Sequence, residues 1–270
     1  MQRAPETLFR VGRKPDVWTW TDPAYIGEGR WDDPEGSYRV LYSSHSAFGA
    51  YLETLAHLRP NPELRAELDA IKKNASGLRA TVLAGPLPRN WRARHILGQG
   101  TPDGVKDPLV AVGKATSLAV LRDALGPVAW RLGIKEIDAG VIRVDFSAEF
   151  RRFTQAISRF IYNQTQANGA SYSGIFYLGQ HGDEVENYAI FERDGDFPVT
   201  HRERSGIDLG DEDFLRACRM LGIRPSRWRG GRPGRVLATA MEAGERQEAS
   251  SKTVALHDSG NGRLEPAEGW

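Results

Sequence analysis

Four side chains in the first sixty residues could do chemistry together: the arginines Arg10 and Arg30, the tyrosine Tyr42 and the glutamate Glu53. Two guanidinium forks suit the diphosphate of a nucleotide, because each presents paired N–H donors to anionic oxygens. A tyrosine offers a flat face on which a ring can stack. A carboxylate on a helix flank can accept a hydrogen bond from a ribose hydroxyl and stabilise positive charge that develops on the sugar. Cleavage of the N-glycosidic bond of NAD would use such a carboxylate.

Each of these four residues also has an ordinary structural interpretation. Arginines such as Arg10 and Arg30 are commonly solvated or held in weak surface ion pairs. A strand tyrosine such as Tyr42 is commonly a core aromatic, and a helical glutamate such as Glu53 commonly faces solvent. Spacing alone does not favour the site over these alternatives. The hypothesis of a site requires all four side chains to meet in one pocket.

Arg30 stands in a loop of unusual composition, "GEGRWDDPEG" at residues 27–36, which places Arg30 and Trp31 among turn-forming residues. Its glycines, Gly29 among them, let the backbone turn tightly and come close to a ligand. We therefore expect the loop to form one wall of a nucleotide pocket. In this interpretation Arg30 points at phosphate or ribose, and Trp31 packs the loop onto the neighbouring strands.

Hydrophobic patterning predicts the elements that would position these side chains. Strands are expected at 7–11 and 39–44, on either side of the loop. Apolar residues at helical spacing predict a helix over 46–58 with Ser46 as its N-cap and Glu53 on its flank. The remaining expected elements are a helix beginning at Asn61 and Pro62, a strand at 78–84, a surface excursion at 85–113, a helix at 115–125, a strand at 139–146, the longest helix of the chain from 147 to a C-cap at Gly169, strands at 173–178 and 187–192, and a helix at 211–223.

Composition places the chain among ordinary globular proteins. Of its 270 residues, 40% are hydrophobic and 26% are charged, which is enough to bury a core. The 36 basic and 35 acidic residues leave a net charge of +1, which argues against direct nucleic-acid binding or a membrane-surface role. We expect one domain over residues 1–228, with a divergent insertion at about 85–138. The Gly, Arg, Glu, Ser and Ala composition of 229–270 predicts a disordered tail.

Several classes of site and location are disfavoured by residues that the sequence lacks. Cys218 is the only cysteine, so neither an internal disulfide nor a thiolate zinc site is expected. The six histidines show no ligand spacing, so we predict no metal site. The familiar phosphate-loop, His-Glu-x-x-His and Gly-x-Ser-x-Gly motifs are missing, and "GQGTPDG" at 98–104 follows no clear strand. Without a signal peptide or a membrane-length apolar run, a cytoplasmic setting is expected.

Five segments of the sequence, in this order, resemble the RES domain family: "LFRVGR", "GEGRWDDPEG", "RVLYSSHSAFGAYLETLAHL", "RRFTQAISRFIY" and "SYSGIFYLGQHGDEVENYAIFE". The resemblance spans roughly residues 7–192, with a divergent middle. It implies an α+β fold whose core is an ADP-ribosyltransferase-like split β-sheet surrounded by helices. It also implies an enzyme that takes NAD as substrate without a further cofactor. Several members of the family are bacterial toxins that deplete NAD by hydrolysis or phosphorolysis, and a helix-turn-helix antitoxin usually restrains them.

The resemblance also assigns roles to individual positions. Arg10 and Arg30 would bind the phosphates or ribose of NAD, with Gly29 and Trp31 completing the loop. Tyr42 would stack on or orient the substrate, and Glu53 would support an oxocarbenium-like transition state.

The departure from the family pattern is at Gly179, which stands where the family carries a serine. Loss of that hydroxyl would remove a hydrogen bond of about 1–3 kcal/mol, or roughly tenfold to a hundredfold in rate. Two alternatives therefore stay open beside the NAD-cleaving enzyme. One is an NAD-binding module with little turnover, and the other is an ADP-ribosyltransferase that modifies a macromolecule.

Overall fold

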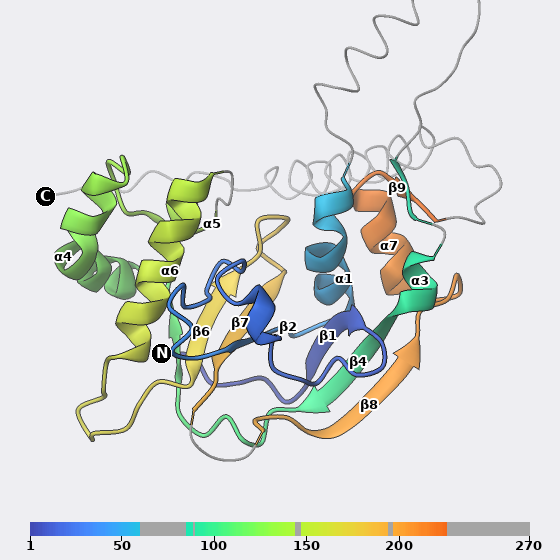
Figure 1. Ribbon diagram of the computed structural model, residues 1–270, viewed down its shortest axis with the longest axis horizontal. Helices are drawn as coiled ribbons and strands as arrows, with labels where there is room; N and C mark the ends of the chain where they lie inside the picture. The colour runs from blue at the N-terminus through green and yellow to red at the C-terminus, as the bar shows by residue number, and fades with distance from the viewer. Residues whose placement is uncertain (60–84, 89, 144–146, 194–196, 226–270) are drawn as a thin grey trace, which may run out of the picture. The chain divides into compact units, whose positions relative to one another are not determined.

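A seven-stranded mixed sheet forms the centre of the fold (Figure 1). The computed structural model describes residues 1–59, 85–88, 90–143, 147–193 and 197–225. The sheet has the order β5-β6-β7-β2-β1-β4-β8, and only β5 and β6 pair in parallel. Together with its helices, the sheet confirms the α+β class. The strands are β1 (Leu8–Arg13), β2 (Val40–Ser44), β4 (His95–Thr101), β5 (Leu109–Ala111), β6 (Gly174–Leu178), β7 (Glu186–Phe191) and β8 (Thr200–Gly206), and a separate parallel pair joins β3 (Gly85–Pro86) to β9 (Ile223–Arg224).

The sheet divides into two halves between β1 and β2. These strands pair at one register position, Phe9 with Ser44. By contrast, β1 pairs with β4 from Leu8 to Arg13, and β2 pairs with β7 from Val40 to Ser44. Beyond the Phe9 pair the two halves therefore share no ladder pairing. A split of this kind leaves room between two strands that are each held firmly on their other side.

The helices form two groups over one face of the sheet, as Figure 1 shows. One group joins α1 (Ala47–Leu55) and its 3-10 extension η2 (Ala56–Leu58) to α7 (Glu212–Met220) beside β1. The other group comprises α4 (Ala115–Arg131), α5 (Ala139–Arg143) and α6 (Ala148–Tyr162) beside β6 and β7. The short segments η1 (Pro23–Tyr25) and α3 (Trp91–Arg94) complete the described helices. In the described part of the chain, no helix has the length and apolar character to cross a membrane.

Local sequence explains why α1 carries Glu53 where it does. Ser46 caps the helix by accepting a hydrogen bond from the amide of Gly49 at 3.1 Å. Phe48, Leu52 and Leu55 are buried in the core that α1 shares with α7. Glu53 consequently lies at the flank of the apolar stripe, as predicted. The predicted strands that became β1, β2, β6 and β7 are also confirmed, with bounds shifted by a residue or two.

The strand predicted at 139–146 is wrong. Residues Ala139–Arg143 form the helix α5, and 144–146 lie outside the described residues. Asp138 starts this helix, because its carboxylate accepts a hydrogen bond from the amide of Val141 at 2.7 Å. Burial is one-sided, with Ile142 in the core. The local cap and this one-sided packing outweigh the strand preference of the β-branched residues.

The surface excursion predicted at 85–113 is also wrong. Its residues His95–Thr101 form β4 inside the sheet, and Leu109–Ala111 form β5 at one end of it. The glycines that suggested a loop lie in β4, where neighbouring side chains pack too closely for a Cβ atom. A Cβ at Gly98 would lie 2.3 Å from Val17 Cγ2, and one at Gly100 would lie 2.4 Å from Val199 Cγ1.

One helix boundary, the longest helix and one strand were also predicted wrongly. Helix α6 ends at Tyr162 with Asn163 as C-cap, while Gly169 lies in a later turn with φ +82°. Among the described helices α4 is the longest, at 17 residues against 15 for α6, although both helices occur where helices were predicted. Strand β8 was not expected, since its residues are polar and exposed throughout. The predicted helix from Asn61, the strand at 78–84 and the tail at 229–270 lie outside the described residues.

Candidate active site

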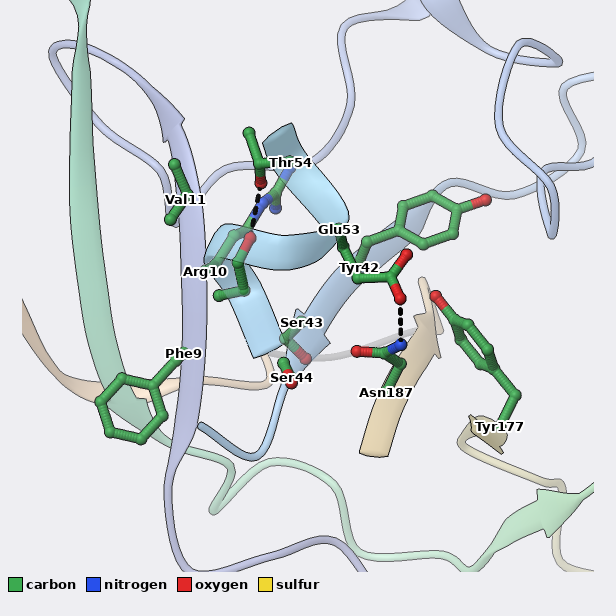
Figure 2. A pocket seen from close by; sticks show the side chains of 11 residues that line it. Phe9, Arg10, Val11, Tyr42, Ser43, Ser44, Glu53, Thr54, Tyr177 and Asn187 are labelled. Atoms are coloured by element: carbon green, nitrogen blue, oxygen red, sulfur yellow. Dashed lines mark hydrogen bonds between the residues drawn. The ribbon is translucent and has the colours of Figure 1, made fainter. Parts of the chain in front are cut away.

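A cavity opens where β1 and β2 part, and Figure 2 shows it from close by. Three of the four residues singled out from the sequence, Arg10, Tyr42 and Glu53, line this cavity. The sheet split and helix α1 therefore bring these three together. The complete lining comes from β1, β2, α1, β6 and β7 and consists of Phe9, Arg10, Val11, Tyr42, Ser43, Ser44, Ala50, Glu53, Thr54, Tyr177 and Asn187.

Glu53 reaches the cavity from α1 and is held there by a residue of β7. Its Oε1 accepts a hydrogen bond from Nδ2 of Asn187 at 2.9 Å (Figure 2). Burial raises the pKa of Glu53, while the bond from Asn187 and the positive charge of Arg30 act in the opposite direction. The amide of Asn187 thus orients the carboxylate within the cavity.

Arg30 does not line the cavity, but it lies close enough to influence it. Its guanidinium carbon is 5.3 Å from the centre of the Trp31 ring and 5.5 Å from that of Tyr177. Its charge also lowers the pKa of Glu53. The loop at residues 27–36, called the arginine loop below, and helix α1 with Glu53 therefore face the same region, although Arg30 is not among the residues that line the cavity.

A buried carboxylate holds the arginine loop in shape. Asp32 accepts hydrogen bonds from the amides of Gly27 at 3.1 Å and Gly29 at 2.8 Å, and from the Tyr42 hydroxyl at 2.8 Å. A side chain at Gly29 is excluded, because a Cβ there would lie 2.5 Å from the Tyr42 oxygen. The Tyr42 hydroxyl also accepts from the amide of Trp31 at 2.8 Å. The observed contacts of Tyr42 thus hold the loop in place, and the stacking role of Tyr42 stays a prediction.

Helix α6 secures the loop from the other side. Nε2 of Gln155 donates to the carbonyls of Gly27 at 2.8 Å and Gly29 at 2.9 Å. Ser158 donates to the carbonyl of Trp31 at 2.6 Å. The Trp31 ring is 0% exposed, and packs against Tyr177 with centroids 5.4 Å apart. The buried Trp31 ring therefore packs the loop against the sheet. Hydrogen bonds to Asp32 on one side and from Gln155 and Ser158 on the other hold the backbone that carries Arg30.

Arg10 enters the cavity from β1. One guanidinium nitrogen donates to the carbonyl of Thr19 at 3.1 Å. Burial lowers the pKa of Arg10 to about 10, although the neighbouring Tyr42 and Asp16 raise it. The side chain is still a cation at neutral pH. It therefore provides a positive charge on the opposite side of the split from Tyr42.

Gly179 lies directly beside Glu53. A Cβ at this position would lie 2.7 Å from Oε1 of Glu53 and 3.0 Å from Cβ of the buried Val185. Contacts this short require a neighbour to move. The chain therefore packs tightly around a glycine beside the carboxylate.

Sequence reasoning missed three polar residues that shape the site: Asn187, Ser43 and Gln155. Each is buried, but each has a polar neighbour in the sequence, Glu186, Ser44 and Thr154 respectively, so local pattern did not single them out. Burying an amide or hydroxyl is favourable only where it finds a hydrogen-bond partner. The identity of that partner becomes visible only when the strands and helices are assembled.

The assembled groups suit reactions in which positive charge develops on a bound molecule. A carboxylate points into a partly enclosed cavity between the rings of Tyr42 and Tyr177. Removal from water strengthens its interaction with a cation. Arg10 and the nearby Arg30 supply positive charge for the anionic part of the same molecule.

Comparison with known proteins agrees with the geometry of the site. The family model described as RES domain matches residues 7–209. This range contains Arg10, the arginine loop, Glu53 and both strands that carry Tyr177 and Asn187. No curated protein matches the chain significantly. RES domains are associated with NAD-related enzymatic activity. Because the match covers three quarters of the sequence, including the segments that build the site, the chain belongs to the RES domain family.

Proposed function

We propose that this protein consumes NAD by cleaving the bond between nicotinamide and ribose. The observation that carries the proposal is the Glu53 carboxylate, held by Asn187 inside a cavity and close to Arg30. NAD itself is the substrate, and no further cofactor is required. Arg10 and Arg30 bind its diphosphate, and Tyr42 orients the nicotinamide riboside end.

The reaction follows from the charges in the site. As the glycosidic bond breaks, its electron pair moves to the positively charged ring nitrogen, and nicotinamide leaves as a neutral molecule. The ribose carbon becomes oxocarbenium-like, and the Glu53 carboxylate stabilises that positive charge. Water then adds to the carbon and loses a proton, giving ADP-ribose. If phosphate adds instead, the product is ADP-ribose 1″-phosphate.

Nicotinamide release from NAD by the purified full chain tests this proposal. We expect nicotinamide release. The assay is run with and without phosphate, and the product, ADP-ribose or ADP-ribose 1″-phosphate, identifies water or phosphate as the acceptor. Radiolabel that remains on a macromolecule after incubation with labelled NAD would instead support an ADP-ribosyltransferase. Calorimetric binding of NAD without product would support a binding module, the alternative that Gly179 motivates. A folded sample that neither binds nor cleaves NAD would contradict the proposal.

The family also suggests a biological role as the toxin of a toxin-antitoxin pair with a helix-turn-helix partner, acting in the cytoplasm. In that role, expression in a heterologous host lowers cellular NAD and arrests growth. We expect an Arg30→Ala variant to relieve both effects, because it loses a diphosphate ligand and a charge beside Glu53. Normal growth and NAD levels with the wild-type chain would count against a toxin.

A further inference from the structure

The two ends of the Asn187 side chain have different surroundings. Nδ2 donates to the Glu53 carboxylate, which can only accept, so the orientation of the amide is fixed. Oδ1 then points to the other side, away from Tyr177 in Figure 2. The side chain is 1% exposed, and within the described residues its Oδ1 has no hydrogen-bond partner. Asn187 therefore presents a buried acceptor in a cavity-lining position.

An unsatisfied buried acceptor is costly, by about 1–3 kcal/mol. In the core such an atom would be a defect, but Asn187 lines the cavity that holds Glu53. A bound molecule that brings an N–H or O–H group would satisfy it.

A primary carboxamide brings such a donor, because its NH₂ group carries two N–H bonds. A carboxylate has no donor and would place a negative oxygen against Oδ1. Within the proposed function, on which this step rests, the substrate carries one carboxamide, that of nicotinamide. The cavity thus offers a complementary acceptor for the end of the substrate that leaves.

We propose that Asn187 determines specificity for the carboxamide: Nδ2 holds Glu53, and Oδ1 accepts an N–H of the nicotinamide amide. One residue then couples recognition of the leaving group to the position of the carboxylate. The site consequently discriminates NAD from its nicotinic acid counterpart, in which a carboxylate replaces the amide.

Kinetics with the two dinucleotides test this assignment. We expect the wild-type chain to prefer NAD over nicotinic acid adenine dinucleotide in kcat/KM by at least roughly tenfold. An Asn187→Ala variant should lower kcat/KM for NAD and bring the ratio of the two substrates close to one. The matched control is Asn163→Ala, which removes an exposed amide at the end of α6 and should leave both values unchanged.

Binding measurements separate this inference from the proposed function. If neither dinucleotide is cleaved, but the wild type binds NAD more tightly and Asn187→Ala removes the preference, the inference stands and the NAD-cleaving function fails. Equal handling of both dinucleotides by the wild type would overturn the inference, even if NAD is cleaved. Should Asn187→Ala fail to fold, Asn187→Leu makes the same test, because it removes both polar atoms of the amide and keeps the branched shape of the side chain. An unchanged preference in that variant contradicts the assignment.

Discussion

At the residue scale, Glu53 and Gly179 are in close contact, at the position where the resemblance to the family predicts a serine. The proposed chemistry depends on where the carboxylate of Glu53 points. Because a Cβ at position 179 would lie 2.7 Å from Oε1, the glycine is part of what allows that position. A larger side chain at position 179 therefore requires Glu53 or Val185 to move.

We therefore expect Gly179→Ser to reduce NAD cleavage rather than improve it. The new side chain displaces Glu53 or Val185, and a misplacement of about 1 Å can lower a rate by roughly a hundredfold. Nicotinamide release measures the effect. Gly206→Ser is the control, because a Cβ there meets nothing within 4 Å. A Gly179→Ser variant as fast as the wild type would show that the glycine is not needed beside the carboxylate.

The ionisation of Glu53 sets the acidic limit of activity. Burial raises its pKa, and the ionised form stabilises the cationic transition state, so activity should fall as pH drops through a value above that of an ordinary glutamate. Arg30 lowers this pKa, as does the bond from Asn187, and Tyr177 is the titratable neighbour on β6. In Arg30→Ala the acidic limb of kcat/KM should shift to higher pH. A limb at the same pH in both proteins would contradict the contribution of Arg30.

At the element scale, α6 acts on the site without lining the cavity. Its Gln155 and Ser158 bind three carbonyls of the arginine loop, whose Asp32 in turn binds Tyr42. The helix therefore determines where the loop presents Arg30. Strand β7 has the corresponding role for Glu53, through Asn187.

Removing the Gln155 amide should loosen the loop. Gln155→Ala leaves the carbonyls of Gly27 and Gly29 without their donor, which should lower the free energy of unfolding by about 1–3 kcal/mol. It should also raise KM for NAD, because Arg30 is held less firmly. Denaturant unfolding and steady-state kinetics measure the two effects, with Gln164→Ala as a control on an exposed glutamine. Unchanged stability and KM would show that α6 does not determine the loop.

The elements that position the site were largely predictable, whereas the bonds between them were not. The Ser46 cap and helical spacing identified α1, helical spacing identified α6, and hydrophobic patterning identified β1 and β2. Strand β4 was missed because Gly98 reads as a loop residue until Val17 is seen packed against it. Four site residues came from motif and resemblance. The roles of Asn187 and Gln155 could not be predicted, because the residues to which they bond are more than a hundred positions away in the sequence.

At the scale of the whole molecule, the site lies at the weakest join of the sheet. The halves meet at the single Phe9 and Ser44 pair, and the cavity is lined by residues of both halves. Helices α1 and α6 cover the same face on either side of the split, and together they bring Glu53 and the arginine loop to one place. The strong pairing of β1 with β4 and of β2 with β7 keeps both walls in position while leaving the space between them open.

The buried carboxylate should lower the stability of the whole fold at neutral pH. Since the folded-state pKa of Glu53 is raised, the folded protein binds this proton more tightly than the unfolded chain, and stability falls as pH rises through the window between the two pKa values. Glu53→Gln should therefore unfold at a higher temperature than the wild type at pH 7. The difference should disappear in acid, below the pKa of an ordinary glutamate. A variant less stable than the wild type at pH 7 would contradict a costly buried charge.

The central claim is that Glu53 drives cleavage of NAD, and nicotinamide release by the wild type and by Glu53→Gln tests it most directly. Glutamine keeps the size of the side chain but removes its negative charge. We predict release by the wild type, and a rate at least roughly a hundredfold lower in the variant, with NAD still bound in calorimetry. A folded Glu53→Gln protein that releases nicotinamide as fast as the wild type would contradict the account.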